Sequence, residues 1–296
     1  MRGFACDARW IIMSHGYSRP VTLALPALMM IASGSIHAVV NAIVKGGKDK
    51  MAARAVTDGS SAIILLPATL FVALPTGAWG WLAASAAIHA LYLYSLIRAY
   101  KVADFSAAYP VLRGTAPLVT ALVTLGMLRQ PGTPYQIGGI AVIGGAMFLL
   151  VAGRHLGRSA LGWSVLTGVS IAAYTVVDAA GVRAAPTPTS YIVWVFVIMG
   201  AVVTTMFSAI GRGEMIAAAR QQWRPGVIAG SLSIVTYGLA LTALSLGPTA
   251  PLAALRETGM VTALGISILV MGERATPGRI TAVFAILAGA ALILAG

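Results

Sequence analysis

Four ionisable side chains lie within long apolar stretches of this sequence: Arg113, Asp178, Arg256 and Glu257. A charge at the centre of a membrane helix costs at least roughly 2.5–3.5 kcal/mol, so it usually pairs or faces a cavity. In one interpretation, the two cations and two anions neutralise each other and fix helix packing. In the other, the arginines bind a carboxylate or phosphate through their planar forks, while Asp178 or Glu257 binds an amine or exchanges a proton.

Two polar stripes occur near these charges. His37 and Asn41 are four residues apart, as are Tyr174 and Asp178, so each pair lies on one face of a helix. These side chains either line a cavity or form hydrogen bonds between helices, each worth only about 0.6 kcal/mol on average in membranes.

The apolar stretches themselves predict membrane spans. Hydrophobic residues make up 58% of the 296 residues and charged residues only 9%, whereas a soluble domain carries about 25% charged residues. A spanning helix needs roughly 20 apolar residues. We therefore predict an all-α polytopic membrane protein with ten spans, at 21–44, 54–75, 79–99, 104–128, 134–152, 160–183, 188–210, 225–246, 249–271 and 276–295.

Lys and Arg residues give the chain a net charge of +12, and they lie mainly between the spans. This pattern favours membrane topology and anionic headgroups over nucleic acid as the reason for the charge. One side of the membrane would carry thirteen of these residues and the other five, which places both termini outside. The single Cys6 excludes an internal disulfide, and we found no motif for a metal, a cofactor or an enzymatic reaction.

An internal repeat appears when the sequence is shifted by 143 residues. Tyr94 then meets Tyr237, Arg113 meets Arg256, and Pro134 meets Pro277, with one compensating pair of gaps. Five spans in each half reverse the orientation of the second half, and inverted repeats are typical of secondary transporters. We expect an N-terminal extension (1–20), a first repeat (21–152) and a second repeat (160–295).

Tyrosines add to the candidate site. Tyr94 and Tyr237 are related by the repeat, and Tyr109 lies one turn before Arg113. They either contact a substrate or anchor span ends at the membrane interface.

Three segments resemble the ten-helix EamA type of the drug/metabolite transporter superfamily. They are HAVVNAIVK (37–45), YPVLRGTAPLVTAL (109–122) and LRETGMVTALGISILVMGERATPGRI (255–280). The most specific features are Gly272, Glu273 and Pro277, whereas Gln130 stands where the first repeat of the family often has Glu. The resemblance implies two inverted five-helix repeats around a central cavity. It also implies export or exchange of small metabolites, often amino acids, and cytoplasmic termini, which the charge distribution contradicts.

These observations lead to the hypothesis of a secondary active transporter in the cell (inner) membrane that moves a small polar metabolite by alternating access. Its expected partners are the substrate, the lipid bilayer and protons coupled through Asp178, with no cofactor and no nucleic acid, in a monomer or homodimer. The alternatives are an integral-membrane enzyme or flippase for a lipid-linked substrate, and a facilitating channel. The expected substrate-binding residues are Arg113, Arg256, Glu257, Asp178, His37, Asn41, Tyr94, Tyr174, Tyr237 and Tyr109.

Overall fold

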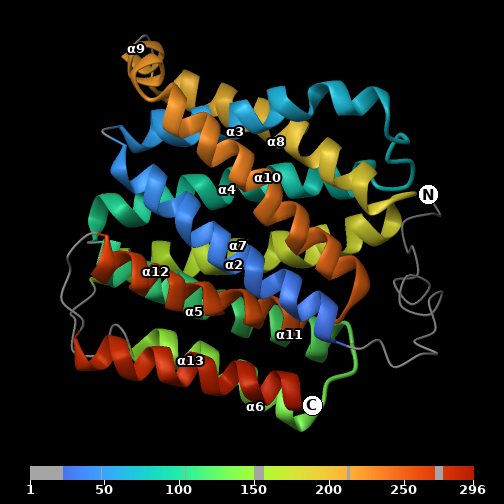
Figure 1. Ribbon diagram of the computed structural model, residues 1–296, viewed down its shortest axis with the longest axis vertical. Coiled ribbons are helices and arrows are strands. Elements are labelled where there is room, and N and C mark those ends of the chain that lie inside the picture. Colours follow the sequence, from blue (N-terminus) through green and yellow to red (C-terminus); the bar gives the residue numbers. More distant parts are fainter. Residues whose placement is uncertain (1–22, 48, 104, 150–156, 212–213, 271–275) are drawn as a thin grey trace.

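The structure is a computed structural model that describes residues 23–47, 49–103, 105–149, 157–211, 214–270 and 276–296. The predicted extension (1–20) and the Gly272–Glu273 motif lie outside the described residues. Helices make up 89% of the structure, and its described part contains no strand. Figure 1 shows the helices side by side in one bundle.

The helices follow the predicted spans closely. In the first half they are α2 (Ala24–Gly46), α3 (Lys50–Leu65) with the 3₁₀ turn η1 (Leu66–Leu70), α4 (Trp79–Val102), α5 (Phe105–Ala121) with the π-turn η2 (Leu122–Met127), and α6 (Pro134–Leu149). In the second half they are α7 (Arg158–Ala184), α8 (Pro188–Gly211), α9 (Glu214–Gln221), α10 (Trp223–Leu246), α11 (Thr249–Leu255), the 3₁₀ turn η3 (Arg256–Thr258), α12 (Gly259–Leu269) and α13 (Pro277–Ala295).

Seven of the described helices are long and apolar enough to cross a membrane: α2, α4, α5 with η2, α7, α8, α10 and α13. The chain is therefore a multi-pass membrane protein. The other three predicted spans correspond to α3 with η1, to the 16-residue α6, and to α11, η3 and α12 in succession. These three are short or interrupted, so the count of ten spans stays a prediction.

Two of the predicted spans are broken within the bundle. Pro110 and Pro117 lie inside α5, where proline removes a backbone donor, and a π-turn follows in η2. The second break is η3, which separates α11 from α12 at the sequence Arg256–Thr258. Both breaks lie on the spans that hold the repeat-related arginines.

Glycines bring helices of the two halves into backbone contact. A Cβ placed on Gly34 of α2 would lie 2.3 Å from the carbonyl oxygen of Arg256, and one on Gly168 of α7 would lie 2.7 Å from that of Leu112 in α5. Close approach of this kind is how small residues stabilise helix pairs in lipid. The two crossings join α2 to η3 and α7 to α5.

The two ends of the bundle differ in charge and packing. One end holds the junctions between α2 and α3 and between α4 and α5, with α9 beside them (upper left in Figure 1). The predicted topology gives this side thirteen of the basic residues and the other side five, and we call it the basic end. Towards the other end, where α2 begins, the main hydrophobic core includes Met30, Leu82, Leu244 and Leu252.

Candidate functional site

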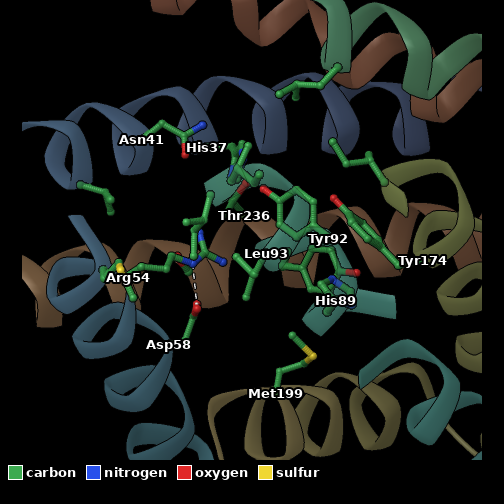
Figure 2. A pocket seen from close by; sticks show the side chains of 18 of the residues that line it. His37, Asn41, Arg54, Asp58, His89, Tyr92, Leu93, Tyr174, Met199 and Thr236 are labelled. Atoms are coloured by element: carbon green, nitrogen blue, oxygen red, sulfur yellow. Dashed lines mark hydrogen bonds and ion pairs between the residues drawn. The ribbon is translucent and has the colours of Figure 1, made fainter. Parts of the chain in front are cut away.

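A cavity of about 410 Å³ lies among the helices and extends from the middle of the bundle towards the basic end. Side chains of α2, α3, α4, α5, α7, α8, α10 and η3 line it. Figure 2 shows part of this lining, with His37 and Asn41 on one side and Met199 on another. Its volume falls in the range of roughly 300–1,000 Å³ that is usual for small-molecule sites.

Most of the predicted site residues line this cavity. The seven that do so are His37, Asn41, Tyr109, Arg113, Tyr174, Tyr237 and Arg256. They come from five helical segments, α2, α5, α7, α10 and η3, which lie in both halves of the sequence. The fold therefore brings residues that are distant in the sequence to one cavity.

Three predicted residues lie elsewhere. Asp178 is fully buried behind the cavity wall, and Glu257 borders a much smaller space next to Arg113 and Arg256. Tyr94 is 46% exposed and packs edge-on against Trp163, with ring centroids 5.9 Å apart. The structure therefore does not bring Tyr94 to the cavity, in spite of its repeat relation to Tyr237.

Arg113 and Glu257 form a buried ion pair, with Nε and Oε2 2.8 Å apart. Both side chains are less than one-tenth exposed. The pair connects α5 in the first half to η3 in the second half. For these two residues the structure agrees with the interpretation in which buried charges neutralise each other.

Asp178 is held by two phenols rather than by a cation. The hydroxyl of Tyr191 donates to Oδ1 at 2.7 Å, and the hydroxyl of Tyr237 donates to Oδ2. Since Tyr237 lines the cavity and Asp178 does not, the carboxylate fixes the position of a lining residue from behind.

Arg256 is less well satisfied than Arg113. Among the described residues it has no ion-pair partner, and its Nε is buried without a hydrogen-bond partner. The guanidinium lies over the ring of Tyr237, 5.6 Å from the centroid, which is a cation–π distance. Arg256 therefore lines the cavity as an arginine without an ion-pair partner among the described residues.

Aromatic rings form the middle of the cavity. His89 stacks on Tyr174 with centroids 4.0 Å apart, and Tyr92 meets Tyr174 edge-on at 5.6 Å. The Nδ1 of His89 also lies 3.0 Å from the carbonyl oxygen of Ser85, which orients the imidazole.

Sequence reasoning missed an ion pair and a histidine in this site. Arg54 begins the predicted span 54–75, and the structure places it in α3, where its Nε is 2.7 Å from Oδ2 of Asp58 at the cavity wall (Figure 2). His89 was also missed. Both Asp58 and His89 lie inside predicted spans, so the rule applied to Asp178 would have found them.

Comparisons with known proteins agree with this architecture. The family described as the EamA-like transporter family matches residues 158–295. No curated protein matches the chain significantly. Among solved structures 28 chains match, and one, described as the crystal structure of a protein, has a TM-score of 0.66 and 17% identity over 91% of this chain and 97% of its own. This likeness shows the fold alone. The second half of the chain carries the EamA-like transporter signature of the drug/metabolite transporter superfamily, as the sequence resemblance predicted.

Proposed function

We propose that this protein is a secondary active transporter, working as an exporter or exchanger of a small polar metabolite such as an amino acid or a related compound. The observation that carries the proposal is the cavity, which lies among spanning helices and whose described lining residues run from the middle of the bundle to its basic end. Access from one side at a time is the requirement of alternating access.

Contacts between the two halves support closure at the other end. Ser190 Oγ donates to the carbonyl oxygen of Ala73, and Trp79 meets Trp194 edge-on with centroids 5.2 Å apart. Each contact joins residues 21–152 to residues 160–295, the two proposed repeats. In the transport cycle these contacts break when the site turns to face that side.

The helix packing supports an inverted pair of five-helix repeats. If the ten spans are numbered in order, α2 with α10 joins spans 1 and 8, and α4 with α7 joins spans 3 and 6. An inverted repeat relates span 1 to span 6 and span 3 to span 8. It therefore turns the pair of spans 1 and 8 into the pair of spans 6 and 3, which is the second pair observed. The pair of α6 with α13, spans 5 and 10, maps onto itself.

Within this mechanism the charged residues have separate roles. Arg256 holds the anionic group of the substrate, His37, Asn41, Tyr174 and Tyr237 shape its site, and the Arg113–Glu257 pair sets the position of η3. Asp178 supports Tyr237 and is the residue we assign to proton coupling. By the positive-inside rule the basic end is cytoplasmic, so the cavity faces the cytoplasm.

Counterflow in liposomes tests the proposal. The purified protein is first screened by thermal shift against amino acids, amines, organophosphates and nucleotide sugars, since a bound ligand stabilises the folded state. Liposomes preloaded with each stabilising compound are then diluted into a trace of the same labelled compound. We expect transient accumulation of label above equilibrium, which a channel does not give. Equilibration without overshoot for every stabilising compound would refute the transporter.

A further inference from the structure

We propose that the cavity selects a single carboxylate group carried on an apolar body, bound through Arg256, and that it discriminates against zwitterions and cations of the same shape. This inference rests on the proposed transport function. Within its substrate class it favours a related compound that carries a single carboxylate over an amino acid itself.

The first step is a count of charges at the cavity. Among the described lining residues, three are arginines and one is a carboxylate: Arg54, Arg113, Arg256 and Asp58. Arg54 is paired with Asp58, and Arg113 is paired with Glu257. Among these lining arginines, Arg256 alone has no ion-pair partner in the described part of the chain, because the carboxylate of Asp178 lies behind the wall and accepts hydrogen bonds from two phenols. A substrate with one negative charge neutralises Arg256, whereas a doubly charged phosphate would add one negative charge that has no partner in the cavity.

The second step is the presentation of Arg256. It lies in η3, between two helices, with its guanidinium over the Tyr237 ring. Its buried Nε has no partner among the described residues. A buried donor on a charge is costly to leave unsatisfied, and a carboxylate satisfies a guanidinium with two parallel hydrogen bonds. Binding an anion therefore completes a site that is already positioned by Tyr237 and, behind it, Asp178.

The third step is the chemistry of the remaining wall. Side chains of α4 and α8 contribute most of the apolar lining, which includes Leu93, Leu96, Ile97, Phe196, Met199 and Phe207. Figure 2 shows Leu93 and Met199 on the same side of the cavity as Asp58, away from His37. Such a wall binds an aliphatic or aromatic body, and the flexible methionine adapts to its shape.

The fourth step concerns a substrate amine. Asp58 is the lining carboxylate of the described residues, and its Oδ2 already accepts from Arg54 at 2.7 Å. An ammonium group would have to displace Arg54 to gain an ionic partner, while also facing the charge of Arg256. A zwitterion therefore loses more on entering the cavity than the corresponding carboxylate.

Three probes with the same phenylethyl body test the inference: 3-phenylpropionate, phenylalanine and phenethylamine. Binding to the purified protein in lipid nanodiscs is measured by calorimetry. We expect 3-phenylpropionate to bind at least about tenfold more tightly than phenylalanine, and phenethylamine to bind most weakly. Arg256→Gln should weaken 3-phenylpropionate by at least about tenfold, the loss of a charge-assisted hydrogen bond. Arg256→Lys keeps the positive charge but lacks the planar guanidinium, so its affinity for 3-phenylpropionate should lie between those of the wild type and Arg256→Gln.

Arg98→Gln is the matched control. Arg98 is an exposed arginine of α4 that lies over the Trp163 ring, 5.1 Å from its centroid, and it is not among the cavity-lining residues. The affinity of the Arg98→Gln protein for 3-phenylpropionate should equal that of the wild type. Gel filtration and the Arg256→Lys variant separate a folding defect from a loss of binding.

The outcomes separate this inference from the transport function. Tighter binding of phenylalanine or phenethylamine, no binding of any probe, or unchanged affinity in Arg256→Gln overturns the carboxylate site. Counterflow of a compound without a carboxylate also overturns it and leaves the transporter standing. Absence of counterflow with every stabilising compound, together with binding of 3-phenylpropionate in the expected order, overturns the transporter and leaves the binding site.

Discussion

The Arg113–Glu257 pair offers the most direct test of how the two halves are held together. Both side chains are buried, with Nε and Oε2 2.8 Å apart. Removing one partner leaves an uncompensated buried charge, which costs about 3–5 kcal/mol. At roughly 2–4 °C per kcal/mol, Arg113→Gln and Glu257→Gln should each lower the unfolding temperature by about 6–20 °C.

The double variant distinguishes a positioning role from a binding role. With both residues changed to Gln, neither position leaves a buried charge that has lost its partner, so the unfolding temperature should return most of the way to the wild-type value. If the pair only positions η3, the double variant also regains part of the transport that each single variant loses. Measured at one scan rate in the same lipid, additive losses in the double variant would show that the two residues are not coupled. Recovery of stability without any transport would assign Arg113 to the substrate.

Three further changes probe other parts of the site. Gly34→Ala should separate α2 from η3 and abolish counterflow, because its Cβ would lie 2.3 Å from a carbonyl oxygen, whereas Gly265→Ala, with open space around it, should be tolerated. Asp178→Ala should lower stability by at least about 2 kcal/mol, since it removes the carboxylate that accepts from two phenol hydroxyls inside the bundle. Asp178→Asn keeps an acceptor and should lose less in thermal unfolding. Asp58→Asn adds a net positive charge to the cavity and should tighten binding of 3-phenylpropionate in calorimetry; weaker binding would contradict the charge count.

Seven of the predicted spans correspond to helices long and apolar enough to cross a membrane, and they were predictable because a bilayer requires a run of about 20 apolar residues. Proline positions were equally readable: Pro134 and Pro277 begin α6 and α13. The turn η3 was not anticipated, because no proline or glycine precedes Arg256 within four residues to mark it. It follows from tertiary contacts, among them the backbone crossing at Gly34.

The sequence indicated which residues belong near the cavity better than it indicated which of them interact with each other. The rule that intramembrane charges need a partner or a cavity singled out Arg113 and Arg256, and both lie at the cavity wall in the structure, while their role in binding stays a prediction. The rule does not say which partner each finds, since that depends on how helices are rotated about their axes. In the structure Arg113 forms an ion pair with Glu257, while Asp178 accepts hydrogen bonds from two tyrosines. Tyr94 lies on the outer face because the repeat relation fixes sequence positions and not exposure.

The glycine crossing of α2 with η3 also has a mechanical consequence. Where backbones touch at a glycine, no side chains interlock at the contact, so one helix can rotate about that point with little steric hindrance. Gly34 lies ten residues from the start of α2 and twelve from its end, so it divides the helix into lever arms of about 15 and 18 Å. A rotation of about 10° would then move each end of α2 by roughly 3 Å while the crossing itself stays in place. Gly34 is thus a fulcrum, and spin labels at the two ends of α2 should change their distances to α12 and α11 in opposite directions when substrate is exchanged.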